Sequence, residues 1–232
     1  MPVVLRLCHV FSLFVASLPG LAFGQDTPVP NVDALAPAYP SPVARLWLAH
    51  MLFARGIADQ DGLTVMAAAH LAAAVPQVPG PPLTKVTEGI AAQVEIGSGA
   101  AGPISVTDML ATARDLAKGD DTALTLIDRA EEAGANGRTD IAVSYNAKLA
   151  PDQTDIWTLP LYGGAYTEIA VIGDGGGNLD LRIIDDQGQE VCRESAPQDI
   201  AFCAFVPAVN GHFKVLVKNP GRAQNAYLLL TN

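Results

Sequence analysis

The sequence predicts an α+β protein of more than one domain, with α-helical hairpins in its N-terminal half followed by an antiparallel, jelly-roll-like β-sandwich. Two observations predict this fold class. Apolar residues recur at helical spacing within residues 41–138. Short runs of β-branched and aromatic residues alternate with glycine-containing turns within residues 155–232. We expect residues 139–154 to be a linker between the two domains.

The first 24 residues have the pattern of a secretory signal peptide. Arg6 precedes an apolar run from Val10 to Leu18, and the small residues Ala22 and Gly24 follow. The alternative, a buried N-terminal helix, is disfavoured by the proline-rich segment that comes next. Because no segment reaches the roughly 20 apolar residues that a membrane span needs, we expect a periplasmic or secreted protein without membrane insertion.

Residues 25–40 are expected to be a flexible tether. The segment is rich in proline, alanine and aspartate and has no periodic apolar face. We expect it to hold the folded body away from the N-terminus.

Four helices are predicted in the N-terminal domain, arranged as two hairpins. Ser41-Pro42 is a typical helix start, and Gly56 is expected to end that helix. Ser105 opens a capping-box-like sequence at the third helix. The predicted helices span about residues 42–56, 63–75, 105–118 and 120–132.

The two predicted hairpins resemble each other in sequence. Residues 54–58 match residues 113–117, which suggests a duplicated helix-turn-helix unit. Chance similarity between alanine-rich helices is the alternative. Residues 76–103 are rich in proline and glycine, and their structure is left open.

Two cysteines, Cys192 and Cys203, remain once the signal peptide with Cys8 is removed. An even number of cysteines in an exported chain predicts a disulfide. A disulfide closing so short a loop stabilises a fold by about 3 kcal/mol in the chain-entropy account. A metal pair is the alternative, but the neighbouring residues offer few further ligands.

The C-terminal domain resembles the bacterial pre-peptidase C-terminal domain, a small β-sandwich. The resemblance covers about residues 155–232, while the N-terminal half resembles no family that we recognise. It implies a non-catalytic role in binding, folding or export. The motifs that carry it are Trp157-Thr-Leu-Pro160, Asn178-Leu-Asp180-Leu181, Gly211-His-Phe213-Lys-Val215 and Asn225-Ala-Tyr227-Leu-Leu229.

Acidic and amide side chains gather near the glycine turn of this domain. Asp174, Asn178 and Asp180, with Asp185 and Asp186 nearby, carry enough oxygen ligands for calcium, although their spacing is not that of an EF-hand. The same residue types beside glycines more often cap turns through local backbone amides. We therefore expect no cofactor and keep calcium as the less favoured hypothesis.

The composition disfavours several classes of function. The formal net charge is −10 and basic clusters are absent, so nucleic acid and anionic membranes are poor partners. His50 and His70 lie on facing predicted helices and could approach each other, but no carboxylate stands at a helical spacing to complete a zinc site. No nucleophile elbow, zinc-protease motif or phosphate loop is present.

These observations predict an exported, non-catalytic protein whose β-sandwich acts as a binding or stabilising accessory module. A secreted hydrolase or hydrolase accessory, in which the β-module positions substrate, is the alternative. We expect a protein or glycan partner. The sequence does not indicate the oligomeric state.

Overall fold

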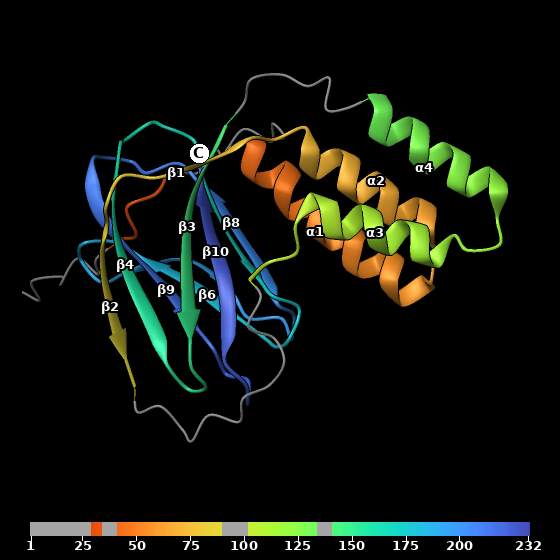
Figure 1. The fold of residues 1–232 in the computed structure, drawn as a ribbon. Coiled ribbons are helices and arrows are strands. Elements are labelled where there is room, and N and C mark those ends of the chain that lie inside the picture. The colour runs from red at the N-terminus through yellow and green to blue at the C-terminus, as the bar shows by residue number, and fades with distance from the viewer. Residues whose placement is uncertain (1–28, 34–40, 90–101, 134–140) are drawn as a thin grey trace, which may run out of the picture.

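The computed structural model describes residues 29–33, 41–89, 102–133 and 141–232. A β-sandwich of two five-stranded sheets lies beside a layer of helices (Figure 1). The predicted fold class is confirmed. The predicted signal peptide, residues 1–24, falls outside the described residues.

The four predicted helices are present, and side-chain caps explain where they begin. Ser41 Oγ accepts from the Val43 amide at 3.2 Å, and Asp61 Oδ1 accepts from the Leu63 amide at 3.0 Å. None of the described helices is long and apolar enough to cross a membrane. The helices are α1 (Pro42–Asp59), α2 (Gly62–Ala73), α3 (Val106–Leu116) and α4 (Asp121–Ala133).

Helix α1 does not end at Gly56 as predicted, but continues to Asp59 and is capped by Gln60 in a left-handed conformation. Gly56 is buried where α1 crosses α2, and a Cβ there would lie 2.6 Å from Cγ2 of Val65. This glycine therefore permits a close helix crossing and does not terminate the helix.

Ten strands form the two sheets. The first sheet has the order β1-β3-β10-β5-β8 and the second β2-β4-β9-β6-β7. All neighbours are antiparallel except β1 and β3. The strands are β1 (Gln77–Pro79), β2 (Thr84–Glu88), β3 (Ala142–Leu149), β4 (Thr154–Leu161), β5 (Thr167–Gly173), β6 (Asp180–Ile184), β7 (Glu190–Glu194), β8 (Ile200–Phe205), β9 (Gly211–Lys218) and β10 (Asn225–Thr231).

The prediction of a linker at residues 139–154 is wrong, because β3 lies within it and β4 begins at its end. Strand β3 pairs with the whole of β10, from Leu149 opposite Asn225 to Val143 opposite Thr231. Strands β1 and β2, from the segment whose structure was left open, also join the sheets. The sandwich thus recruits strands from well before residue 155.

The described part of the predicted tether, residues 29–33, is docked on the sandwich. The Asn31 amide donates to Asp185 Oδ2 at 2.9 Å, and Asn31 Oδ1 accepts from the Val209 amide at 2.9 Å. Asp33 donates its amide to the Val206 carbonyl at 2.7 Å. These contacts show that this part of the segment is fixed to the body, contrary to the prediction of a free tether.

Apolar residues of both sheets fill the interior of the sandwich, which also contains one polar network. Trp157 Nε1 donates to the Tyr227 hydroxyl at 2.9 Å, and that hydroxyl donates to Asp155 Oδ2 at 2.6 Å. Lys85, on edge strand β2, forms an ion pair with the same carboxylate at 3.0 Å. Burial, together with Asp155, raises the pKa of the Tyr227 phenol.

Helix α1 packs on the outer face of the first sheet, so the helices and the sandwich share an apolar cluster. Its members include Leu46 on α1, Ile172 on β5 and Leu230 on β10. Trp47 stacks on Phe202 of β8 with ring centroids 5.2 Å apart. This packing gives the helical layer its position beside β5 and β8.

A buried carboxylate on β5 also fixes the start of α1. Glu168 accepts from the Ala44 amide at 2.9 Å and from the Ser41 hydroxyl. A carboxylate at a helix N-terminus is favoured by the helix dipole and by free amides of the first turn. Burial raises the pKa of Glu168.

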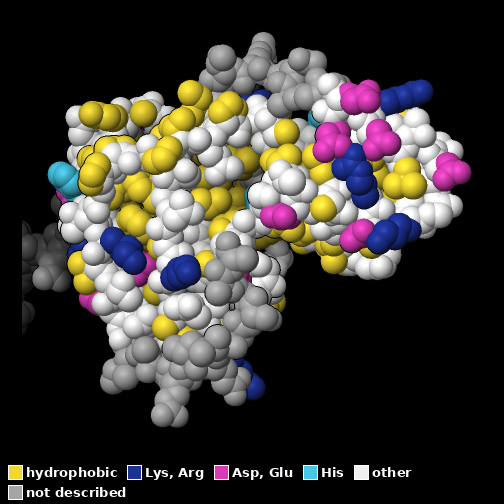
Figure 2. All heavy atoms as spheres, viewed as in Figure 1, with side chains coloured by type: hydrophobic (Ala, Val, Ile, Leu, Met, Phe, Trp, Pro, Cys, Tyr) yellow, Lys and Arg dark blue, Asp and Glu magenta, His cyan; other side chains and the backbone are white. Residues whose placement is uncertain are grey.

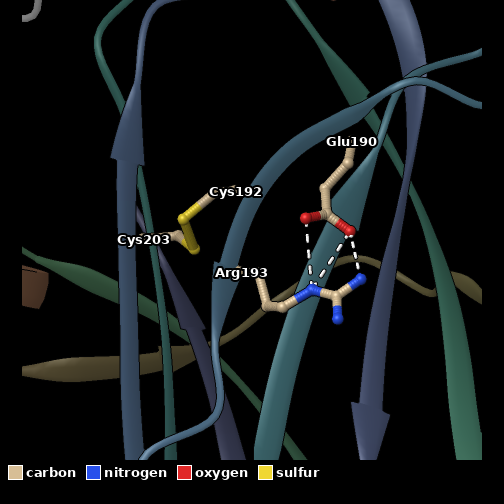
Figure 3. The surroundings of a disulfide bond; sticks show 4 residues. All are labelled: Glu190, Cys192, Arg193 and Cys203. Carbon is tan, nitrogen blue, oxygen red and sulfur yellow. Dashed lines mark hydrogen bonds and ion pairs between the residues drawn. A yellow bond between two sulfur atoms is a disulfide. The ribbon is translucent and has the colours of Figure 1, made fainter.

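The predicted disulfide is confirmed. Cys192 on β7 is bonded to Cys203 on β8, so it joins the edge strands of the two sheets (Figure 3). Beside it, Arg193 forms an ion pair with Glu190 at 2.6 Å. The chain between the two cysteines includes residues 197–199, which border the cavity described next.

Candidate binding cavity between helix α1 and the sheet

A cavity of about 600 Å³ lies between α1 and the end of the first sheet, and we call it the helix–sheet cavity. Hydrophobic side chains gather over the sandwich in the view of Figure 2, whereas charged side chains are frequent on the helical layer. Both the helical layer and the sandwich supply residues to the walls of the cavity. The lining residues are His50, Met51, Phe53, Ala54, Arg55 and Ile57 of α1, Ile104, Ile172–Gly175 and Gly177 at the end of β5, and Pro197–Ile200.

The glycine turn after β5 is held against Asp199. A Cβ at Gly173 would overlap the carboxyl group of Asp199, so the absence of a side chain at Gly173 lets Asp199 take this position. Asp199 Oδ2 accepts from the Gly175 amide at 2.6 Å, and Oδ1 accepts from Asn225 Nδ2 at 2.5 Å. The turn thus places a fixed carboxylate at the wall of the cavity.

A second carboxylate, that of Asp174, lines the same wall. Its oxygens accept from the amides of Gly176 at 3.1 Å and Ala226 at 3.0 Å. Burial raises the pKa of Asp199, and the nearby charge of Asp174 raises it further. Within the described ranges, neither carboxylate forms an ion pair with a lysine or arginine.

His50 lines the cavity from α1 and is only 6% exposed. Burial lowers its pKa from 6.5 to about 4, so the ring is neutral at pH 7. Among the residues that the structure describes, its imidazole has no hydrogen-bond partner. His70, with which the sequence suggested an approach, is exposed on α2. Its ring nitrogens are not among the fully buried side-chain atoms of the described residues that lack a partner, so they are reachable from the cavity.

A second hollow of about 270 Å³ lies beside the cavity, also against α1. The two share Met51, Gln198 and Ile200. The second hollow is also bordered by Glu194 and by the stacked rings of Trp47 and Phe202. The two hollows therefore lie side by side between α1 and the edge of the sheet, and we call the pair the groove.

The structure separates the residues of the calcium hypothesis. Asp174 lines the helix–sheet cavity, whereas Asp180 borders a different hollow on the second sheet. Asn178 donates to Asp180 Oδ1 at 3.4 Å, and Asp185 Oδ1 accepts two turn amides, those of Gln187 and Gln189. In the described parts of the chain, no three His, Cys, Asp or Glu residues are grouped to hold a metal. Calcium binding stays a prediction.

Sequence reasoning missed Asp199 and Asn225, which build the polar wall. Asp199 and the glycine turn are more than twenty positions apart, and only the pairing of β5 with β8 brings them together. The sequence placed His50 on a predicted helix that faces the helix of His70, and not at a cavity. Its link to the cavity depends on which face of the sheet α1 covers.

No family model matches the chain, and no curated protein sequence matches it. Similar solved structures include the pre-peptidase C-terminal domain of a collagenase from Bacillus anthracis, at 16% identity over 39% of this chain and 88% of that chain, with a TM-score of 0.34. A periplasmic inhibitor of g-type lysozyme from Aeromonas hydrophila is 14% identical over 39% of this chain and 84% of its own, with a TM-score of 0.31. The first of these structures is a domain of the family that the sequence of the sandwich resembles.

Proposed function

We propose that this chain is an exported, non-catalytic binding protein whose helical layer and β-sandwich together form a ligand site in the helix–sheet cavity. The observation that carries this proposal is the buried imidazole of His50, which lines a cavity of about 600 Å³ without a hydrogen-bond partner among the described residues. Ligand sites in proteins have volumes of roughly 300–1,000 Å³, with a few polar groups in a mainly apolar wall. A ligand in the cavity could therefore form a hydrogen bond with the imidazole, which as a neutral ring offers one donor and one acceptor.

Two features support export. Residues 1–24 have the charge, apolar run and small residues of a signal peptide. The Cys192–Cys203 disulfide forms and persists mainly in oxidising compartments, such as the periplasm or the exterior of the cell. A periplasmic or secreted location is therefore part of the proposal.

The surroundings of His50 support a non-catalytic role. A nucleophile in a hydrolase is activated by a base within hydrogen-bond reach, and that base is itself oriented by a third group. Across the described residues, His50 has neither a hydroxyl or thiol to activate nor a carboxylate to orient it. No described contact favours the alternative of a hydrolase.

Ligand-observed NMR with a fragment library tests the site. Ala54 is exposed and lines the cavity, so Ala54→Trp should block it without disturbing the core. Ala58→Trp, one turn further along the exposed face of α1, is the matched control. We expect fragments that bind the wild type and Ala58→Trp but not Ala54→Trp. The proposal is wrong if no fragment binds, or if all hits bind the three proteins equally.

A further inference from the structure

We propose that the helix–sheet cavity binds a peptide segment of a partner protein that presents a lysine or arginine beside an apolar side chain. This inference rests on the proposed function and names the class of ligand. It follows from the charge, the lining and the shape of the groove.

The charges around the groove favour a cationic ligand. Asp174 and Asp199 line the cavity, and neither has a lysine or arginine partner within the described ranges. Glu194 adds a third carboxylate at the second hollow. The cation that lines the cavity, Arg55, is already paired with Asp59 at 2.5 Å. Opposite charges attract more strongly beside a partly buried, apolar wall than in water.

The carboxylates keep capacity for a ligand. Each oxygen of Asp174 and Asp199 accepts one hydrogen bond from a described residue of the protein. A carboxylate oxygen can accept two, so each retains an acceptor site for an ammonium or guanidinium group. Because these hydrogen bonds, three from backbone amides and one from Asn225, already fix both carboxylates, a cationic ligand would not have to order them.

The remainder of the lining favours an apolar neighbour for this cation. Most of the side chains that complete the walls are hydrophobic, which suits an aliphatic or aromatic side chain. A bare metal ion would leave this apolar space unfilled. The hydrophobic lining residues are Met51, Phe53, Ile57, Ile104, Ile172 and Ile200.

The length of the groove and the state of His50 favour a peptide. The cavity and the second hollow lie side by side and share Met51, Gln198 and Ile200, so an extended segment could place one side chain in each hollow. A neutral imidazole offers one donor and one acceptor. A peptide group supplies the matching acceptor and donor.

Affinity selection from three libraries of capped hexapeptides tests this. The central pair is Leu-Lys, Leu-norleucine or Leu-Glu, and the flanking positions are randomised. The full-length, oxidised chain is immobilised in about 0.15 M salt, where distant surface charges are screened. We expect the Leu-Lys library to be enriched about tenfold over the Leu-norleucine library, which corresponds to about 1.4 kcal/mol.

Variants locate the preference. Asp199→Asn should abolish the enrichment for lysine, whereas Asp186→Asn, which makes the same charge change on the exposed β6–β7 turn, should retain it. Ala54→Trp should remove selection from all libraries, and Ala58→Trp should not. The Ala54→Trp result keeps the inference testable if Asp199→Asn does not fold.

The outcomes separate this inference from the proposed function. Equal selection from all three libraries, lost in Ala54→Trp, leaves a binding cavity but overturns the preference for a cation. If no library is selected but fragments still bind in the cavity, the inference that the ligand is a peptide is wrong. A rise in melting temperature with calcium chloride alone that Asp199→Asn abolishes would show that the carboxylates hold a metal instead. Failure of both peptides and fragments would refute the proposed function itself.

Discussion

Two buried ionisable side chains, Asp155 and His50, have opposite surroundings. Asp155 is fully buried in the sandwich, and its carboxylate accepts hydrogen bonds from Lys85, Thr87 and Tyr227. His50 is almost as buried, yet its ring has no hydrogen-bond partner in the described part of the chain. When a buried polar group has hydrogen-bond partners, the cost of its desolvation is offset within the protein. A polar group without a partner that lines a cavity is available to a ligand.

Removing Lys85 from the hydrogen-bond network around Asp155 should have the largest effect on stability. Lys85→Met leaves the buried carboxylate of Asp155 without its ion-pair partner, and breaking a buried pair in this way costs about 3–5 kcal/mol. We expect a value near the lower end, because the Lys85 side chain is 30% exposed. Urea unfolding measures this change.

Lys214→Met is the matched control for this prediction, since Lys214 is exposed on β9 and forms no ion pair among the described residues. It should change the free energy of unfolding by less than about 0.5 kcal/mol. Equal losses from both lysine variants would show that the Asp155 network does not stabilise the core.

The disulfide joins a strand of the sandwich, β7, to β8, and the loop that it closes includes the cavity residues 197–199. Replacing Cys192 and Cys203 together by alanine should lower the free energy of unfolding by about 3 kcal/mol. It should also weaken binding at the cavity. Thiol labelling of the unfolded, unreduced wild type should find both cysteines blocked, and labelling of both would refute the bond.

The lowered pKa of His50 makes the free energy of unfolding depend on pH. The folded-state pKa is lowered from 6.5 to about 4, so below pH 6.5 the unfolded chain takes up a proton that the folded protein does not. Stability should therefore fall as the pH decreases from 7.5 to 5, by about 2 kcal/mol from this group. His50→Leu should remove that part of the slope, and His212→Leu, at an exposed position on β9, should not. Equal slopes in the wild type and His50→Leu would show that His50 is not held neutral.

The sequence predicts the helices and strands better than it predicts the long-range contacts that bring the cavity residues together. Helix starts are local, since Ser41 and Asp61 cap their own first turns. The predicted end of the first helix at Gly56 was wrong, because glycine ends many helices whereas this glycine faces Val65 of another helix. Strand β3 was missed because it stands in a segment without glycine turns and is recognisable mainly by its pairing with β10. Asp199 reaches the glycine turn only through strand pairing, which no local pattern specifies.

The smallest expected effect concerns calcium. The carboxylate oxygens of Asp174 and Asp185 cap turns through backbone amides, and Asp180 borders a separate hollow. We therefore expect calcium to leave the melting temperature of metal-stripped protein unchanged. A ligand held only by the folded state at a hundredfold excess over Kd would stabilise it by about 2.7 kcal/mol, so a site would be plain in a thermal melt. A rise that Asp180→Ala abolishes would place calcium at Asp174, Asn178 and Asp180 after all, and would mean that the loop closes around the ion when it binds.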